Sequence, residues 1–444
     1  MEFLHGEEID HLKYSYQALK EGYTAHPENI LIVDYDEFMS DPHQTMAHIE
    51  SFWDLEYFEH DFNSIDGSSV VEDDENAWGV SGLHNIQPTL KATGTNPSEI
   101  LGEHCYKFQA PKFWLGETKA KKDVLDLQLE AALRGDFKTS EALCKTICEL
   151  RPTDDRASFN RGWHLMRRGE LLKGHKLLAR GRKERVFGNI PCSYQPEWKQ
   201  GDVGTVLLTL EGGLGDQIHG FRYANDLEKL GNRVALTCSS ELAPMFAGQF
   251  ITVQHEASAG VFHDFHVPAM SAPANLGYEY SDLSGEAYIE RTAEPIKGRI
   301  GVRWSGNTKF EHEQHRQFPA DLMFDAVRSL DCISLQRDEG LELKPGWMPQ
   351  ADVSHWEATR RSISECEKVI TSCTSVAHLS AAMGIETWIV VPILPYYLWA
   401  LPGSTTPYYD SVKLFRQETY GEWSAPFQQI KEELHCSHTL HMVS

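Results

Sequence analysis

The chain of 444 residues is 41% hydrophobic and 11% aromatic, and its formal net charge at pH 7 is −24. This length predicts a globular protein with several domains, because one small core cannot organise so long a chain. The acidic balance argues against binding to nucleic acid, since phosphate neutralisation requires clustered Lys and Arg, although a local group of donors could still hold an anionic ligand.

The cysteines and the apolar segments predict the cellular compartment of the protein. Nine cysteines without a Cys-x-x-Cys pair predict neither a zinc site nor a disulfide framework. The first residues lack the basic and apolar regions of a signal peptide. The longest apolar run, residues 387–401, contains two prolines and is too short to span a bilayer. We therefore expect a soluble, cytoplasmic protein with reduced thiols and no membrane span.

Residues 1–118 form the first of four expected domains and are acidic, aromatic and irregular. A strand is predicted at 30–35, and the Asp41-Pro42 turn precedes a helix with Met46, Ile49 and Trp53 on one face. Residues 30–65 and 72–86 resemble the C-terminal portion of bacterial sulfotransferases. That family's sulfonate-donor loop lies at its N-terminal end, and nothing before residue 30 could serve as one. We therefore expect no sulfonate transfer.

Residues 119–190 are predicted to be helical repeats. Aligning "LRGDF" with "RRGEL" places Gly135 over Gly169 and Phe137 over Leu171, a period of 34 residues. This is the tetratricopeptide period, in which small residues stand where two antiparallel helices approach. An unrelated four-helix segment is the alternative.

From residue 200 onward strands and helices alternate, which predicts parallel sheets covered by helices on both faces. Two blocks, 200–295 and 296–444, indicate an α/β fold with two facing Rossmann-like domains. The expected strands are 204–211, 233–239, 250–255, 299–306, 332–336, 368–373 and 387–392, and the expected helices are 217–231, 320–330, 356–367 and 375–384.

A glycine-rich turn, "EGGLGD" at residues 211–216, separates a predicted strand from a predicted helix. Gly213 and Gly215 would let the backbone approach a phosphate, and the helix N-terminus would favour an anion; Gln217 follows in the first helical turn. The turn lacks the third glycine of a dinucleotide-binding fingerprint and is not followed by Gly-Lys-Ser/Thr. A plain tight turn is the alternative.

The second block places polar groups where its strands end, which is the edge at which open α/β sheets bind ligands. Basic residues follow one strand, hydroxyl residues begin a helix, and a glutamine follows another strand. Together the two edges predict a cleft that fits a diphosphate. The alternatives are an ordinary solvated loop and a plain helix cap. The residues are Arg303, Lys309, Arg316, Gln336, Thr374 and Ser375, with Arg337 as a further candidate for contact with the nucleotide.

These blocks, in this order, resemble tetratricopeptide-linked glycosyltransferases of the GT-B fold, akin to bacterial heptosyltransferases and more distantly to O-linked N-acetylglucosamine transferases. The resemblance implies an inverting, metal-independent transfer from a nucleotide-diphosphate sugar, with no cofactor. The acceptor would be a glycan or a protein held by the helical repeats. Cys373 stands where heptosyltransferases usually have an aspartate that meets the donor sugar, which argues against a heptose donor.

The resemblance also assigns roles to single residues. Asp216 corresponds to the general base that takes the acceptor's proton. Lys309 and Arg316 would neutralise the diphosphate, and Thr374 and Ser375 would contact the donor. The helix N-terminus predicts that Asp216 is well ionised, so helix capping is its alternative role, and His219 one turn later is the alternative base.

Two other functions remain open at this point. The chain could be a scaffold whose helical repeats bind a peptide while its α/β domains are inactive. It could also be a metal-dependent GT-A transferase with Asp34 and Asp36 as the metal-binding pair.

Overall fold

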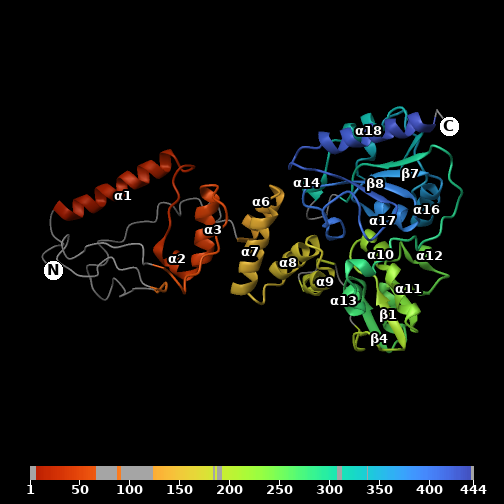
Figure 1. Cartoon of the computed structure of the whole chain (residues 1–444), viewed down its shortest axis with the longest axis horizontal. Coiled ribbons are helices and arrows are strands. Elements are labelled where there is room, and N and C mark those ends of the chain that lie inside the picture. Colours follow the sequence, from red (N-terminus) through yellow and green to blue (C-terminus); the bar gives the residue numbers. More distant parts are fainter. Residues whose placement is uncertain are drawn as a thin grey trace. The chain divides into compact units, whose positions relative to one another are not determined.

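The structure of the chain is a computed structural model that describes residues 7–66, 88–91, 124–183, 186–187, 193–307, 313–337 and 339–441. The chain divides into two compact units, Met1–Leu129 and Glu130–Ser444, and each is considered by itself (Figure 1). Lys309 and the sulfotransferase-like residues 72–86 lie outside the described residues. In the described part of the chain, no helix is both long enough and apolar enough to cross a membrane.

The described part of the first unit contains α1 (Glu7–Ala25), α2 (Tyr35–Ser40) and α3 (Pro42–Phe52). The strand expected at 30–35 is wrong, because the backbone turns into α2 there. The Asp34 carboxylate caps that helix by accepting hydrogen bonds from the backbone N–H groups of Asp36 (3.1 Å) and Glu37 (3.4 Å). The side chain of Asp34 therefore works as a helix cap.

Helix α3 confirms the helix expected after Asp41, with Pro42 as its first residue, but it buries a different face from the expected one. Its buried residues are Ala47 and Glu50, whereas Trp53 is 60% exposed. The Glu50 carboxylate accepts hydrogen bonds from the Phe58 backbone N–H (3.2 Å) and from His60 Nε2 (2.8 Å). Glu50 therefore fixes the segment that follows the helix.

Four helices follow: α6 (Val124–Leu133), in which the boundary between the units falls, α7 (Phe137–Leu150), α8 (Asp155–Arg167) and α9 (Leu171–Leu178). Gly135 and Gly169 both have positive φ, +80° and +91°, so the turns that precede α7 and α9 match each other. Helices α8 and α9 pack closely through Gly162 and Gly174. The described part of this segment is helical, and its assignment to tetratricopeptide repeats stays a prediction.

Two parallel sheets form the rest of the second unit, which confirms the predicted α/β class. The first sheet has the order β3-β2-β1-β4 and the second has the order β6-β5-β7-β8-β9, with parallel pairing throughout. The strands are β1 (Thr205–Thr209), β2 (Arg233–Cys238), β3 (Ile251–Gln254), β4 (Phe265–Pro268), β5 (Ile300–Arg303), β6 (Cys332–Ser334), β7 (Lys368–Ser372), β8 (Glu386–Val391) and β9 (Val412–Arg416).

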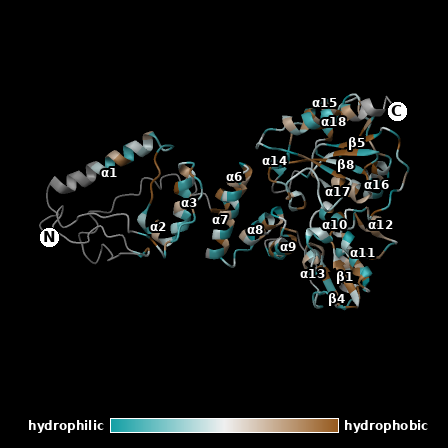
Figure 2. Cartoon of the chain, in the orientation of Figure 1, coloured by the Kyte–Doolittle hydropathy of each residue, from teal (hydrophilic) through white to brown (hydrophobic). Residues whose placement is uncertain are grey.

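Central strands supply the cores of the two sheets, and they are the brown segments of Figure 2. In β1, for example, Val206 and Leu208 are fully buried. The covering helices are α10 (Leu214–Gly220), α11 (Arg222–Lys229), α12 (Ala243–Phe246), α13 (Ala272–Leu276), α14 (Glu313–Arg316), α15 (Ala320–Val327), α16 (Trp356–Ser364), α17 (Ser375–Ala382) and α18 (Ser424–His441).

The sequence-based prediction missed the short helices α12, α13 and α14, the longer helices α1 and α18, and the strands β4 and β9. Strand β4 has only four residues, one of them proline, and β9, at the edge of its sheet, has a lysine and an arginine among its five residues. Neither forms the continuous apolar run by which a buried parallel strand is recognised.

Gly162 offers a test of the α8–α9 packing. A methyl group on its Cα would lie 2.8 Å from the Gly174 carbonyl oxygen and 2.9 Å from the Leu178 nitrogen, both of them backbone atoms. We predict that Gly162→Ala lowers the free energy of unfolding by about 1–3 kcal/mol, as overpacking does. The matched control is Gly346→Ala, where an added methyl group meets nothing within 4 Å. Equal urea midpoints for the two variants would contradict the prediction.

Candidate functional site

The strand order places one topological switch point in each sheet. In the first sheet β2 and β4 flank β1, and in the second β6 and β7 flank β5. On the two sides of β1, and likewise of β5, the chain therefore continues to further strands in opposite directions across the sheet. Open α/β sheets bind ligands outside the carboxyl ends of the strands at such points. The glycine-rich turn and α10 follow β1, and α17 follows β7.

Helices α10 and α17 bring these two switch points together, as Figure 1 shows. A Cβ on Gly215 would lie 2.9 Å from His378 Cδ2 and 3.3 Å from the Ser375 Cα, so Gly215 lies in close contact with α17. The glycine predicted to admit a phosphate therefore makes room for a helix.

The other two glycines shape the turn itself. Gly212 has φ +82°, and its N–H donates to the Phe187 carbonyl (3.0 Å). The Gly213 N–H donates to Asp216 Oδ2 (2.9 Å). Gln217 is buried and stabilises the turn: its side chain donates to the Gly212 carbonyl (3.1 Å) and accepts from the Ser239 N–H (2.8 Å). The predicted donor-binding groups Gly213 and Gln217 thus build the turn.

The Asp216 carboxyl is partly buried, and burial raises its pKa to about 6. The nearby Tyr396 hydroxyl, the hydrogen bond from the Gly213 N–H and the positive charge of Arg316 all oppose this rise by stabilising the carboxylate. The helix start alone predicts a strongly ionised group. Because burial outweighs the helix effect, Asp216 is a better proton acceptor than the sequence indicated.

His219, the alternative base, points into the protein core. Its Nδ1 lies 3.1 Å from the Tyr409 hydroxyl and its Nε2 lies 3.4 Å from the Tyr223 hydroxyl. Burial and the nearby Arg222 hold its pKa well below the usual range, so the ring is neutral. His378 shares the Tyr409 hydroxyl (3.1 Å). The geometry favours Asp216 over His219 as a base.

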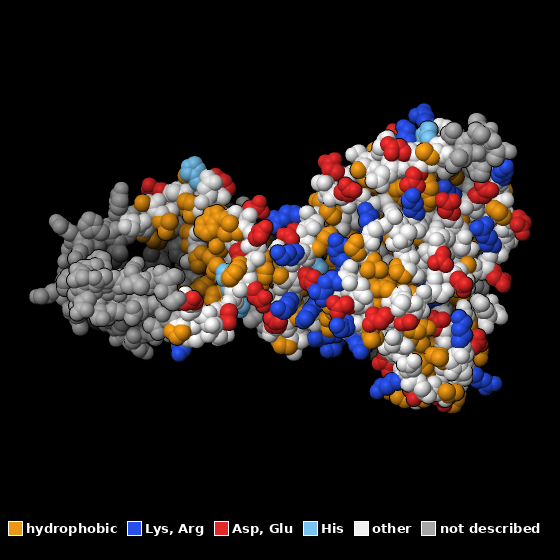
Figure 3. Space-filling model, in the orientation of Figure 1, with side chains coloured by type: hydrophobic (Ala, Val, Ile, Leu, Met, Phe, Trp, Pro, Cys, Tyr) orange, Lys and Arg blue, Asp and Glu red, His pale blue; other side chains and the backbone are white. Residues whose placement is uncertain are grey.

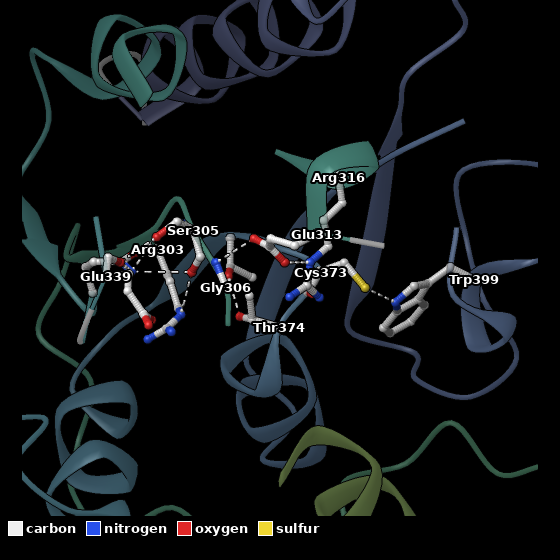
Figure 4. A network of polar contacts seen from close by, with 11 residues as sticks. Arg303, Ser305, Gly306, Glu313, Arg316, Glu339, Cys373, Thr374 and Trp399 are labelled. Atoms are coloured by element: carbon white, nitrogen blue, oxygen red, sulfur yellow. Dashed lines mark hydrogen bonds and ion pairs between the residues drawn. The ribbon is translucent and has the colours of Figure 1, made fainter. Parts of the chain in front are cut away.

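Arg316 lies beside the start of α17 (Figure 4). Its Nη1 donates to the Cys373 carbonyl (2.6 Å), and its Nε pairs with the Glu313 carboxylate. Glu313 also accepts from the Gly306 N–H (3.3 Å), which ties α14 to the loop after β5. The basic residue predicted to bind a diphosphate is therefore at the expected edge, and Glu313 holds it in place.

Arg303 and Gln336 fix the loops at the same edge. The Arg303 guanidinium donates to the carbonyls of Ser305 (3.1 Å) and Leu335 (3.2 Å). Gln336 is fully buried; it accepts from the Ser305 N–H (3.1 Å) and donates to the Ser305 hydroxyl (2.7 Å) and the Glu339 carbonyl (2.8 Å). Burial leaves Gln336 a structural role, which does not support the predicted contact with a donor.

Thr374 and Ser375 begin α17 as predicted. Thr374 occupies the N-cap position, with its hydroxyl 3.4 Å from that of Thr371, and Ser375 is partly exposed. The Cys373 thiol before them accepts a hydrogen bond from Trp399 Nε1 (2.9 Å), and burial raises its pKa to about 11. An uncharged thiol therefore stands immediately before the two hydroxyl residues that begin α17.

The sequence did not predict an ion pair next to the turn, in which a partly exposed arginine meets a buried carboxylate. Arg182, which ends η4 (Ala179–Arg182), donates to both carboxylate oxygens of Glu211 at 2.7–3.2 Å, and to the Ser271 hydroxyl at 2.8 Å. Burial raises the pKa of Glu211, and Arg182 opposes that rise. An acid at the end of an apolar strand was the available signal, but its partner cannot be read from a local pattern.

No protein-family model matches the chain, and no curated protein matches it either. Among solved structures, the chain is similar to the iron-containing dodecameric glycosyltransferase TibC from enterotoxigenic E. coli H10407, at 12% identity and a TM-score of 0.37, covering 55% of this chain and 78% of that chain. A structure of the iron-containing heptosyltransferase TibC in complex with ADP-D-beta-D-heptose has 15% identity and a TM-score of 0.34, with 55% and 79% covered. Likenesses with TM-scores below 0.5 decide neither the fold nor the function of this chain.

The expectation of a transfer without any cofactor is contradicted, because both similar structures are described as iron-containing. That expectation came from the family resemblance alone, which does not report bound iron. Within the described ranges of this chain, no group of three or more His, Cys, Asp or Glu side chains could hold a metal ion.

Removing Arg182 should test this ion pair. Arg182→Ala leaves the Glu211 carboxylate buried and uncompensated, so we predict a loss of about 3–5 kcal/mol in the free energy of unfolding at pH 7, measured by urea denaturation. The control is Lys183→Ala at the next position, where the side chain is 72% exposed and stability should hardly change. A small loss in Arg182→Ala, equal to that in the control, would refute the assignment.

Proposed function

We propose that this protein is a glycosyltransferase of the GT-B type, which moves a sugar from a nucleotide-diphosphate donor to a hydroxyl group of an acceptor. The observation that carries the proposal is the placement of Asp216 and Arg316 beside the contact between α10 and α17. Asp216 follows Gly215, where an added Cβ would lie 3.3 Å from the Ser375 Cα, and Arg316 Nη1 donates to the Cys373 carbonyl (2.6 Å) just before α17. A proton acceptor and a cation thus both lie near the point where the two helices meet.

Asp216 supplies the base in this proposal. As the acceptor oxygen bonds to the anomeric carbon, its proton passes to the Asp216 carboxylate, and the bond between the sugar and the diphosphate breaks. The electron pair of that bond leaves with the nucleoside diphosphate. Attack from the face opposite the leaving group inverts the anomeric centre.

Arg316 and the start of α17 receive the leaving group in this proposal. Negative charge grows on the diphosphate as its bond to the sugar breaks, and a guanidinium can bond two phosphate oxygens together. Thr374 and Ser375 add hydroxyl groups at the helix N-terminus, which favours anions. Lys309 remains a proposed second cation. In a chain with net charge −24, local donors must carry the binding, and Figure 3 shows basic and acidic side chains interspersed on the face in view.

A thermal-shift panel of UDP, GDP, ADP and CMP, with the matching monophosphates, tests the proposal. A ligand at a hundred times its Kd stabilises the fold by roughly 2.7 kcal/mol, which raises the melting temperature measurably. We expect one nucleoside diphosphate to bind more tightly than its monophosphate. If no nucleotide shifts the melting temperature, the proposal fails and the alternative of an inactive scaffold is favoured.

In the same panel, Arg316→Ala should abolish the preference for the diphosphate, and Arg316→Lys should restore little of it, because lysine lacks the planar guanidinium group. An unchanged ratio of the two Kd values in Arg316→Ala would remove Arg316 from the site.

Asp216→Asn should reduce turnover by about 10² or more and leave nucleotide affinity nearly unchanged. Because burial raises the pKa of Asp216 to about 6, wild-type turnover should be constant above that pH and fall as the carboxylate is protonated below it. Burial disfavours the charged form, so above pH 6 the substitution should leave the melting temperature equal or higher. A lower melting temperature with intact turnover would make Asp216 a helix cap.

A further inference from the structure

The helical segment carries a charge opposite to that of the rest of the chain. Residues 151–183 contain ten Lys and Arg but only three Asp and Glu, a net charge of +7, in a chain whose net charge is −24. Figure 3 shows basic side chains in the region where Figure 1 places α8 and α9. A local excess of this kind favours an anionic partner, because complementary charge steers association.

Several cations of this segment already have a carboxylate partner. Arg168 pairs with Glu141 and with Glu170, at 2.8 Å each. Arg180 pairs with Asp155 at 2.6 Å. The charges of these arginines are therefore balanced by acidic side chains of the chain itself.

Arg167 of α8 and Arg416 at the end of β9 differ from these cations. Arg167 Nη1 donates to the Ala400 carbonyl (3.4 Å). Arg416 donates to the carbonyls of Leu401 (2.6 Å) and Gly403 (2.5 Å). Neither guanidinium group forms an ion pair with an acidic side chain in the described part of the chain. Two positive charges thus lie beside one turn of the chain without a carboxylate.

Both guanidinium groups can still receive a ligand. Each has N–H groups beyond those used in these bonds, and both side chains are partly exposed. The Arg167 guanidinium carbon lies 3.9 Å from the centroid of the Phe137 ring, which fixes its position. Burial, and after it the charge of Arg167, lowers the pKa of Arg416 to about 10, so Arg416 is charged at neutral pH. A bound anion would relieve the repulsion between the two cations.

The residue after Arg416 has a donor without a partner. The side-chain oxygen of Gln417 accepts from the Ile393 N–H (3.1 Å), whereas its Nε2 is buried and bonds to nothing among the described residues. Ile393 also contacts the helical segment, since a Cβ on Gly135 would lie 3.1 Å from its Cδ1. Buried donors are nearly always paired, so an oxygen atom from outside these residues would satisfy Gln417.

The register of the second sheet places these groups level with the start of α17. Ser372 of β7 and Phe415 of β9 both pair with Val390 of β8. Because neighbouring strands lie about 4.8 Å apart, Arg416 follows its strand on the order of 10 Å from the start of α17. A partner held by Arg416 could therefore extend to the proposed transfer site.

We propose that Arg167 and Arg416 form a carboxylate-binding site for a short acidic peptide segment of the acceptor. That the peptide belongs to an acceptor rests on the proposed function, whereas the site itself does not. A guanidinium group matches a carboxylate with two parallel hydrogen bonds. The strongly acidic remainder of the chain repels a long polyanion such as a nucleic acid, so a few Asp or Glu side chains of a peptide fit this site better.

The test measures the binding of fluorescein-labelled hexaglutamate to the full chain by fluorescence anisotropy at low ionic strength, with hexaglutamine as the uncharged counterpart. In Arg167→Gln and in Arg416→Gln the Kd of hexaglutamate should rise about tenfold, the scale of a lost hydrogen bond to a charged group. The matched control is Arg168→Gln, which removes the same charge at the next position. Glu141 and Glu170 already balance that charge, so the Kd should hardly change.

Absence of hexaglutamate binding, equal binding of hexaglutamine, or an equal loss in Arg168→Gln overturns the inference. Equal binding of hexagalacturonate overturns the assignment to a peptide, and a loss of nucleoside diphosphate affinity in Arg167→Gln overturns the assignment to the acceptor. Melting temperatures within a few degrees of the wild type show that the variants are folded. Should Arg416→Gln unfold, Arg416→Lys keeps the charge without the planar group, and its Kd should also rise.

The peptide assay uses no sugar donor, so its outcome is independent of the nucleotide panel. Selective hexaglutamate binding alongside a failed nucleotide panel would refute the glycosyltransferase proposal and leave the carboxylate site in place. A nucleotide panel that succeeds while hexaglutamate fails to bind would refute the carboxylate site alone.

Discussion

The approach of α10 to α17 at Gly215 is the contact on which the arrangement of the second unit depends. A side chain there would meet His378 at 2.9 Å, so the two helices can touch only because the residue is glycine. The contact sets the carboxyl ends of β1 and β7 against each other. Asp216, Thr374 and Ser375 lie at the starts of these two helices, and Arg316 of α14 donates to the Cys373 carbonyl just before α17.

Next to this contact, buried polar side chains form a seam between the two sheets, and their hydrogen bonds make the packing of the sheets specific. The Tyr409 hydroxyl is bonded to His219, His378 and Tyr288 at 3.1 Å each. The Arg222 guanidinium lies over the rings of Tyr288 (4.8 Å) and Tyr409 (5.1 Å), where aromatic faces stabilise its charge. Burial, and after it the charge of Arg222, lowers the pKa of both histidines, so both rings are neutral. Neutral histidines locked in a seam stabilise it and are poorly placed for proton transfer.

The helical segment before the sheets supports the site as well as preceding it. Its Trp163 bonds to the loop after β8, its His175 bonds to the Met270 carbonyl (3.0 Å), and Arg182 neutralises Glu211. These bonds reach both sheets. Any partner that moved α8 or α9 would therefore act on the surroundings of Asp216, which gives the segment a physical route to influence the chemistry in addition to any role in holding an acceptor.

The amino-acid sequence by itself determined the alternation of strands and helices, the glycine turn after β1 and the hydroxyl residues at the start of α17. Those features depend on local apolar periodicity and on turn residues, which a short window contains. Tertiary structure alone decided that Gly215 admits a helix, that Gln336 is buried and that His219 points inward. It also decided the pKa of Asp216, since its burial and the nearby Tyr396 and Arg316 come from segments far along the chain. Burial and ionisation are properties of neighbours in space, and no local pattern encodes which neighbours those are.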